Sequence, residues 1–310
     1  MRIVSLLPSL TEICWALGLA DELVGVTHEC DYPPPVRFKP RVTRSLLPPG
    51  LSHAEIDAAV RERTAAQLPL YALDTELLAT LQPDLILTQA LCPVCAVSID
   101  DVCQLAATLP GPPRVLSVEP TTLEEILVSV ELVARETGRE RTARAIVSAL
   151  RQRLAWLSAR LAGRTEEPRV VCLEWLEPPI VAGHWVPEMV AAAGGKDVLG
   201  IAGRPSYTVT WEQVAAAEPD ILVAMPCGYT LAETVDLARQ LLGHPILESI
   251  PAVQRGAFWA VDASAYFSRP GPRVVHGVEI LAAILHPERC SSDVQRLAVP
   301  VRTSTPLTPA

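Results

Sequence analysis

Short apolar runs alternate with longer segments of helical periodicity along most of the chain. In the first part, the apolar runs predict strands at Ile3–Leu7, Glu22–Thr27, Asp84–Gln89 and Arg114–Val118. Helical patterns fill the intervals between them. Strands that alternate with helices in this way are typical of a parallel sheet covered by helices. The pattern therefore predicts an α/β lobe at the start of the chain.

The same alternation begins again in the second half of the chain. The strands predicted there are Arg169–Leu173, Ile180–Ala182, Asp220–Met225 and Ala257–Val261. Between the two halves, the segment Thr121–Leu161 carries apolar residues at helical spacing, with Gly138 as its main interruption. This segment predicts one long helix, or two helices placed end to end.

The predicted fold class is α/β, with two Rossmann-like α/β lobes joined by a long bridging α-helix. The expected boundaries are 1–118 for the N-terminal lobe, 119–166 for the bridging helix and 167–289 for the C-terminal lobe. Residues 290–310 are rich in Ser, Thr and Pro and show no periodicity, so a disordered tail is expected there.

One short internal repeat supports two related lobes. The segments Glu76–Leu87 and Glu212–Val223 both contain a Glu, six residues, the pair Pro-Asp and three aliphatic residues. Each segment predicts a short helix, a turn and a buried strand, so the same unit occurs once in each lobe.

Length and charge limit the classes of partner. The 310 residues are about twice the usual size of one domain, in agreement with two lobes. The formal charge is 26 − 35 = −9 and no basic block interrupts it, which disfavours nucleic acid as a partner. No apolar run approaches the roughly 18 residues of a membrane span, so no membrane insertion is expected.

The compartment depends on whether the given chain starts at the natural beginning. The first residues contain no apolar core long enough for a signal peptide. The chain as it stands is therefore expected to be cytoplasmic, and periplasmic or otherwise extracytoplasmic if an upstream signal has been removed.

Three features together carry a resemblance to a known family. They are the segment Arg2–Glu12 (RIVSLLPSLTE), the strand Val24–Val26 followed by Cys30–Pro34 (CDYPP), and the paired repeats. They resemble the vitamin B12-binding members of the helical-backbone substrate-binding proteins, which serve ABC importers for cobalamin, haem and iron–siderophores. The resemblance covers nearly all of residues 1–288 and is closest to a signal-less branch. The chain differs by an insertion over about residues 45–70.

The resemblance implies a binding protein without catalytic activity, whose ligand is held in a cleft between the two lobes. The expected ligand is cobalamin or a related corrinoid, with haem or an iron–siderophore as the alternative. The expected role is delivery to an ABC importer, or transfer of the corrinoid within the cytosol. A protein whose cleft has lost its ligand, and which serves only as an interaction partner, is a further alternative.

Candidate ligand-binding residues follow from the rule that α/β lobes bind ligands beyond the carboxyl ends of their strands. Aromatic side chains at these positions suit a large flat macrocycle, and only 5% of the residues are aromatic. The candidates are Trp175, Trp185, Tyr207, Tyr229, Tyr266, Tyr32, His28 and Cys30. The resemblance places Trp175 and Tyr207 at or beside positions where B12 binders have stacking aromatics. For each of them, an ordinary core or surface position is the competing interpretation.

Two acidic residues are candidates for docking on a partner. The resemblance implies that Glu76 and Glu212, which begin the repeated segments, contact arginines of the membrane subunits of an importer. The alternative is purely local, because an acidic residue in the first turn stabilises any helix.

The cysteines allow a different class of function. Cys92 and Cys95 have the two-residue gap that lets two thiolates bind one metal ion. His28 and Cys30 are expected on the same rim of the first lobe as this pair, and Cys227 is expected to face them from the other lobe, so the five residues form a candidate metal site. They could hold a metal ion, provide a ligand to cobalt, or act as a redox pair in a metal-binding or redox protein or enzyme. The competing interpretation is buried thiols or an incidental disulfide.

Overall fold

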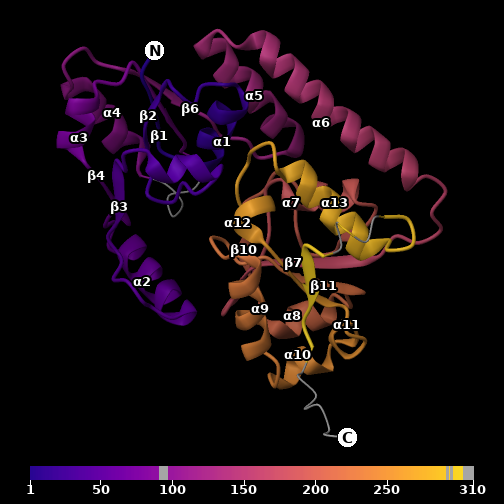
Figure 1. Ribbon diagram of the computed structural model, residues 1–310. Coiled ribbons are helices and arrows are strands. Elements are labelled where there is room, and N and C mark those ends of the chain that lie inside the picture. The colour runs from indigo at the N-terminus through magenta and orange to yellow at the C-terminus, as the bar shows by residue number, and fades with distance from the viewer. Residues whose placement is uncertain (91–96, 291–292, 294–295, 303–310) are drawn as a thin grey trace, which may run out of the picture. The chain divides into compact units, whose positions relative to one another are not determined.

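The computed structural model describes residues 1–90, 97–290, 293 and 296–302. The chain divides into two compact units, each with its own sheet and helices (Figure 1). Unit 1 comprises Met1–Pro120 and Ile126–Ser148, and unit 2 comprises Thr121–Glu125 and Ala149–Ala310. Among the described residues, no helix has both the length and the apolar character needed to cross a membrane.

Unit 1 is built on a four-stranded sheet whose neighbouring strands are all parallel. In the order β2-β1-β5-β6, its strands are β2 (Leu23–Val26), β1 (Ile3–Ser5), β5 (Leu85–Thr88) and β6 (Arg114–Ser117). Each lies within a strand predicted from the sequence. The central strands β1 and β5 are completely buried, as expected for a parallel sheet that helices cover.

The helices of unit 1 follow the strands and supply the rest of its core. They are α1 (Pro8–Ala16), the short 3-10 helix η1 (Pro34–Phe38), α2 (His53–Ala65), α3 (Thr75–Leu81) and α4 (Ile99–Thr108). One hydrophobic core joins side chains from β1, α3, β5 and α4, among them Val4, Leu78, Ile86 and Val102. The α/β class predicted for this part of the chain is confirmed.

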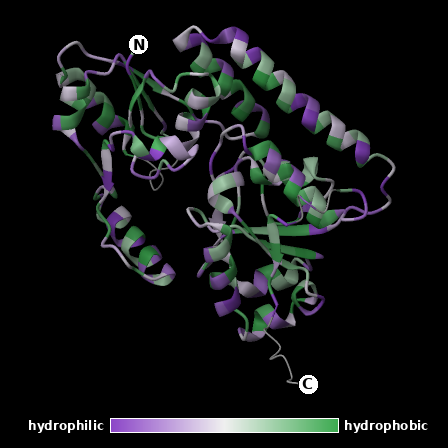
Figure 2. Ribbon diagram, viewed as in Figure 1, coloured by the Kyte–Doolittle hydropathy of each residue, from purple (hydrophilic) through white to green (hydrophobic). Residues whose placement is uncertain are grey.

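The connecting segment forms two helices, α5 (Leu123–Thr137) and α6 (Glu140–Arg160). They are separated at Gly138, whose φ of +67° is easily adopted only without a side chain. The division between the two units falls inside α6, between Ser148 and Ala149. In Figure 2 the strands are mainly hydrophobic in colour, whereas α6 carries both hydrophobic and hydrophilic residues along its length.

The expected insertion begins and ends in a small antiparallel sheet. Strand β3 (Thr43–Ser45) pairs with β4 (Tyr71–Leu73), and α2 lies between them in the sequence. Ser52 and Glu55 form a reciprocal capping box at the start of α2. Of the residues in α2, only His53 is buried, and Figure 1 shows the helix extending away from the sheet of unit 1.

Unit 2 contains a larger, mixed sheet. Its order is β10-β8-β7-β11-β12-β13, with β9 also paired to β7. Strands β7, β11 and β12 are parallel, whereas β8, β10 and β13 are added in antiparallel fashion. The strands are β7 (Arg169–Leu176), β8 (Pro179–Val181), β9 (Lys196–Asp197), β10 (Tyr207–Thr208), β11 (Ile221–Ala224), β12 (Phe258–Val261) and β13 (Ala298–Pro300). The four strands predicted in this half of the chain are thus confirmed.

Seven helices described in unit 2 surround this sheet. They are α7 (Val186–Ala192), α8 (Trp211–Ala216), α9 (Leu231–Gln240), α10 (Pro245–Ser249), α11 (Pro251–Gln254), α12 (Ala263–Tyr266) and α13 (Val274–Leu285). Helix α13 is buried along most of its length, which agrees with its strongly apolar sequence.

Strand β13 corrects the expectation of a disordered tail from residue 290 onward. Residues 298–300 pair with β12, and the following Val301 is only 2% exposed. The apolar segment Leu297–Val301 is short and is flanked by Ser, Thr and Pro residues, so its pattern does not predict a strand. Its proline is tolerated because β13 is an edge strand of the described sheet, where a missing N–H need not break a ladder.

The predicted repeat is present as the same local structure in each unit. Helix α3 leads through Pro-Asp to β5, and α8 leads through Pro-Asp to β11. In both, the residue before the proline has a left-handed backbone: φ is 44° at Gln82 and 45° at Glu218.

The aspartates of the two repeats make the same hydrogen bond. Asp84 Oδ2 accepts from the backbone N–H of Arg2 at 2.6 Å, and Asp220 Oδ2 accepts from that of Arg169 at 2.9 Å. The side chains of the two arginines also donate to carbonyls near the ends of α3 and α8. Similar contacts therefore join a helix end to the first strand of each unit.

Asp197, at the end of β9, is an unusual carboxylate within unit 2. Its Oδ1 accepts from the backbone N–H groups of Leu199 and Gly200, at 3.1 and 2.6 Å. The residue as a whole is partly exposed, but its Oδ2 is buried and has no hydrogen-bond partner among the described residues. Burial raises the pKa of this carboxyl to about 6, against the lowering effect of the two amide hydrogen bonds.

Candidate functional site

The parallel strands of each unit bring their carboxyl ends to one edge of the sheet, where ligands of α/β proteins bind. In unit 1 this edge comprises the ends of β1, β2 and β5 together with the loop 27–43, and we call it the unit 1 edge. In unit 2 it comprises the ends of β7, β11 and β12 with the loops that follow, and we call it the unit 2 edge.

A hydroxyl–imidazole network lies on the unit 1 edge. The backbone N–H of His28 donates to Thr43 Oγ1 at 3.0 Å, and His28 Nδ1 lies 2.7 Å from the same oxygen. Thr43 Oγ1 is also 2.8 Å from Thr27 Oγ1. Arg41 donates from Nη1 to the carbonyl of Thr27 at 2.8 Å, which holds the loop against the end of β2.

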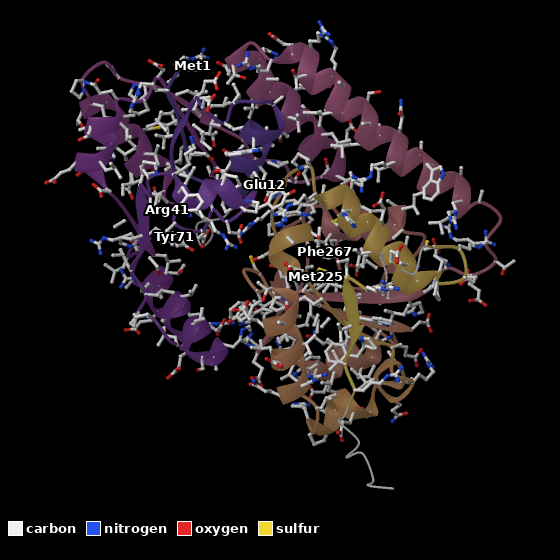
Figure 3. All side chains as sticks on the ribbon, viewed as in Figure 1. Met1, Glu12, Arg41, Tyr71, Met225 and Phe267 are labelled. Carbon is white, nitrogen blue, oxygen red and sulfur yellow. The ribbon has the colours of Figure 1, made fainter. Side chains whose placement is uncertain are left out.

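The imidazole of His28 is half-buried. Burial lowers its pKa, and the positive charge of Arg41 lowers it further. The ring of Tyr71, on β4, lies 5.6 Å from the His28 ring at 46°. Figure 3 labels Arg41 and Tyr71, on the two segments that lead to and from the α2 insertion.

The unit 1 edge also presents aromatic surface. Tyr32 is 44% exposed and Phe38, at the end of η1, is 91% exposed. Tyr32 was predicted as a ligand-binding residue, whereas Phe38 and Tyr71 were not. An aromatic residue in a polar, proline-rich loop is the signal that would have selected Phe38. Tyr71 gave no such signal, because its contact with His28 depends on how β3 and β4 pair.

Cys30, predicted as a ligand or metal residue, is part of the interior of unit 1. It is 1% exposed, and its Sγ lies 3.1 Å from Thr11 Oγ1, which in turn donates to Ser5 Oγ at 2.9 Å. This buried position corrects the prediction that Cys30 contacts the ligand. A free cysteine packs in a core as a small apolar side chain, and its weakly polar thiol can contact a neighbouring hydroxyl such as that of Thr11.

On the unit 2 edge, two of the predicted aromatics lie together. The rings of Trp175 and Tyr229 are 5.9 Å apart in a T-shaped arrangement at 72°. The indole N–H of Trp175 donates to the carbonyl of Glu177 at 3.1 Å, which holds the ring at the carboxyl end of β7. The backbone N–H of Cys227 donates to the carbonyl of Glu174 at 2.9 Å and holds the loop after β11 beside it. Both rings are partly exposed.

Tyr266 forms a second aromatic group on this edge. Its ring is 5.0 Å from the ring of His276, and the guanidinium of Arg273 lies 5.8 Å from its centre. The backbone N–H of Ser264 donates to the carbonyl of Tyr229 at 3.2 Å, so α12 is attached to the loop that carries the first aromatic pair. The unit 2 edge thus combines aromatic surface with positive charge.

Two further predicted aromatics do not join these groups. Trp185 is only 7% exposed, and its indole N–H donates to the carbonyl of Phe267 at 2.8 Å. It is a core residue, which corrects its prediction as a ligand-stacking side chain. Tyr207 is exposed. It pairs with Val181 of β8, and Val181 pairs with Leu173 of β7, so Tyr207 is in register with the middle of β7 and not with its carboxyl end. Its hydroxyl donates to the carbonyl of Leu199 at 2.8 Å.

The five residues of the predicted metal site can be followed only in part. Cys92 and Cys95 lie outside the described residues. Within the part of the chain that the structure describes, no group of three or more His, Cys, Asp or Glu side chains is arranged to hold a metal ion. Cys227 is exposed in the loop after β11.

The two candidate docking acids occupy matching positions. Glu76 and Glu212 are each the second residue after the cap, in the first turns of α3 and α8. Both are exposed. An acidic side chain there also stabilises the helix, because it faces the positive end of the helix dipole.

Comparison with known proteins places this architecture in a family. The vitamin B12-binding protein of Vibrio cholerae is 25% identical over 298 residues, with 92% of this chain and 88% of the relative covered. An uncharacterised ABC transporter substrate-binding lipoprotein of Bacillus subtilis is 26% identical, with 93% and 80% covered. Among solved structures, the periplasmic haem-binding protein RhuT of Roseiflexus sp. RS-1 is similar, with a TM-score of 0.70, 25% identity, and 92% and 98% of the two chains covered.

The profile of one protein family extends over most of the chain. It matches residues 3–265, which include every strand of the two main sheets except β13. The chain therefore belongs to the periplasmic binding protein family.

Proposed function

We propose that this chain is the substrate-binding component of an ABC importer and that its ligand is cobalamin or a related cobalt corrinoid. The candidate contacts are the residues described on the unit 1 edge and on the unit 2 edge, and the ligand is bound without being chemically changed. Family membership supports the binding role, and the B12-binding relative supports the corrinoid. Because a similar solved structure is that of a haem-binding protein, haem is the main competitor, with an iron–siderophore as the other.

The observation that carries the proposal is the aromatic surface of the unit 2 edge. The T-shaped pair of Trp175 and Tyr229 is partly exposed. The indole N–H of Trp175 donates to the carbonyl of Glu177, and the backbone N–H of Tyr229 donates to the carbonyl of Pro226. A rigid aromatic surface binds a flat macrocycle at a small cost in side-chain entropy. Tyr266 with Arg273 adds a second aromatic face with a positive charge, which suits the polar periphery of a tetrapyrrole.

The unit 1 edge supplies a second set of candidate contacts in this proposal. Tyr32 and Phe38 expose apolar rings, and His28 presents a half-buried imidazole whose ring lies 5.6 Å from that of Tyr71. Pocket walls of this type, mostly apolar with a few fixed polar groups, are typical of sites for small molecules.

Delivery to an importer assigns a role to the exposed acids. Glu76 and Glu212 occupy equivalent positions in the two repeats, so a pair of related membrane subunits would meet the same local structure twice. In this role the chain acts outside the cytoplasmic membrane. We propose these two carboxylates as the contacts with cationic side chains of the membrane subunits.

The proposal is tested by titrating the reduced protein with hydroxocobalamin, ferric haem and a ferric siderophore, with binding measured by calorimetry and by quenching of tryptophan fluorescence. We expect saturable binding of the corrinoid with one ligand per chain. Replacing Trp175 by Ala should weaken it by roughly 30-fold, the effect of losing a central aromatic contact worth about 2 kcal/mol.

The matched control is Trp156→Ala. Trp156 lies on α6, is 59% exposed, and contacts Arg160 rather than either edge. Its replacement should leave affinity unchanged. Preference for haem or for the siderophore over hydroxocobalamin would contradict the corrinoid assignment, and no binding of any of the three would contradict the proposal as a whole.

A further inference from the structure

Helix α6 carries positive charge in an acidic chain. Its 21 residues contain five arginines and a single acidic residue, Glu140, whereas the whole chain has a formal charge of −9. Uncharged residues separate the arginines, so the linear sequence shows no basic block. The helix gathers them, because residues three, four or seven positions apart lie on the same face.

Three of these arginines lie on the outer side of the helix. Arg141, Arg144 and Arg160 are all exposed. The opposite side is buried through residues that are at most 7% exposed: Ala143, Val147, Leu150 and Leu157. The outer side is therefore set by the spacing along one regular helix, with its apolar stripe turned inward.

The other two arginines of α6 have partners within the chain. Arg151 forms an ion pair with Glu124. Arg153 donates from Nε and Nη2 to the two carboxylate oxygens of Glu279, at 2.9 and 2.6 Å. These two side chains hold α6 in place, and their charge is compensated.

Arg141 and Arg144 are not used in this way. Among the described residues, neither forms an ion pair, in contrast to Arg151 and Arg153. Arg141 also lies in the first turn of α6, where a positive charge opposes the helix dipole. Helix stability therefore does not account for it, and its charge is available to a partner outside the chain.

An exposed tryptophan accompanies the arginines. Trp156 is 59% exposed, and the guanidinium of Arg160 lies 5.2 Å from the centre of its ring in a cation–π contact. Arg160 Nε also donates to the carbonyl of Arg289, which fixes this guanidinium beside the ring. We call Arg141, Arg144, Trp156 and Arg160 the α6 basic face.

We propose that the α6 basic face docks on the surface of a membrane that contains anionic phospholipids, without insertion into it. Arginine binds phosphate groups through paired hydrogen bonds, and tryptophan is enriched at the level of the lipid headgroups. The face extends over about 28 Å, at about 1.5 Å per residue, and α6 has no acidic residue between its two ends. An extended cationic surface of this kind matches a plane of headgroups better than a single small anion.

This inference goes beyond the proposed function and does not depend on the ligand. The contact uses residues of α6 that belong to neither the unit 1 edge nor the unit 2 edge. It concentrates the chain at a membrane surface, where the membrane subunits of an importer lie.

The test is co-sedimentation of the ligand-free chain with two kinds of vesicle. One kind is phosphatidylcholine alone, and the other contains a quarter of phosphatidylglycerol. We expect binding to the anionic vesicles and little binding to the neutral ones. Binding should be lost at about 1 M salt, where charges are screened beyond about 3 Å.

Two sets of variants change the affinity in opposite directions. Replacing both Arg141 and Arg144 by Gln should lower the partition coefficient about 30-fold, because each cationic side chain near an anionic surface contributes about a factor of five. Ala145→Arg adds a cation at an exposed position of α6 and should raise it about fivefold. Trp156→Ala should lower it, and Trp156→Phe should lower it less, because Phe keeps an aromatic ring.

The matched control removes the same charge elsewhere. Arg239 and Arg255 are exposed residues of unit 2 outside α6, and replacing both by Gln should leave the partition coefficient unchanged. Glutamine is about as good a helix former as arginine, so the circular dichroism of the Arg141/Arg144 variant should match the wild type. Its affinity for hydroxocobalamin should also match.

Several results would overturn the membrane assignment. They are absence of binding to both vesicles, equal binding to both, or an equal loss in the control pair and the Arg141/Arg144 pair. A fourth is binding of heparin, lost in the Arg141/Arg144 variant, by a chain that ignores anionic vesicles, since the face would then serve an acidic macromolecule. None of these results bears on the ligand titrations, so the proposed function is tested separately.

Discussion

Replacing Asp197 by Asn removes a buried negative charge that lowers the free energy of unfolding at neutral pH. The carboxyl keeps its Oδ2 buried without a partner, and burial raises its pKa from 3.8 to about 6. The native state therefore binds a proton more tightly than the unfolded state. Between about pH 4 and pH 6 the unfolded chain binds fewer protons, so the stability of the wild type falls as the pH rises through this range.

The size of the effect follows from the two pKa values. The difference between about 6 and 3.8, at about 1.4 kcal/mol for each pH unit, sets an upper limit of about 3 kcal/mol. Because Asp197 is partly exposed, screening by water reduces this to about 1–2 kcal/mol. Asparagine keeps an oxygen that can accept from the N–H groups of Leu199 and Gly200, so the turn itself is retained.

The assay is urea unfolding at pH 4 and at pH 7.5, followed by far-ultraviolet circular dichroism. Asp197→Asn should be more stable than the wild type by about 1–2 kcal/mol at pH 7.5 and nearly equal to it at pH 4. Asp236→Asn, an exposed position on α9, is the control and should change neither curve. An equal loss of stability at both pH values would refute the reasoning, because it would mean that the carboxylate stabilises the turn.

Three further predictions test individual contacts by urea unfolding. Trp185→Phe loses an indole donor and leaves a buried carbonyl unsatisfied, so it should cost about 1–3 kcal/mol while ligand affinity is unchanged; weaker binding would contradict its core assignment. Gly183→Ala places a Cβ 2.4 Å from the carbonyl of Arg204 and should cost more than about 2 kcal/mol, and a neutral effect would show that this backbone can move. Asp220→Ala removes the acceptor for the N–H of Arg169 and should cost about 1 kcal/mol, whereas no cost would contradict a stabilising role for the repeat.

The strands of the two parallel sheets were predictable because of their burial. A strand covered on both faces must be apolar along its length, as in β1, β5 and β11, so a short apolar run between helices identifies it. The repeat was equally visible, since its Pro-Asp pair is required at one turn in each unit. Gly138 marked the interruption between α5 and α6 because its backbone conformation excludes most side chains.

Short or edge elements were not predictable in the same way. Strands β3, β4 and β13 contain three residues each, too few for a periodic pattern, and they form only by pairing with distant segments.

The candidate site was predicted unevenly for a related reason. The rule of carboxyl strand ends selected Trp175, Tyr229 and His28, which lie at carboxyl ends of strands in the structure, and their role in binding a ligand stays a prediction. It did not separate them from Trp185 and Cys30, which follow the same pattern but find partners in the interior. Whether an aromatic or a thiol is buried depends on long-range packing, which spacing along the chain does not contain.

The central claim is the proposal that candidate residues on the unit 1 edge and on the unit 2 edge contact the ligand. Hydrogen–deuterium exchange of the intact chain, with and without saturating hydroxocobalamin, tests it directly. The account predicts slower exchange in two sets of segments: residues 27–43 and 71–73 of unit 1, and residues 174–177, 226–230 and 263–269 of unit 2. Protection confined to one unit, or located outside these segments, would contradict the account.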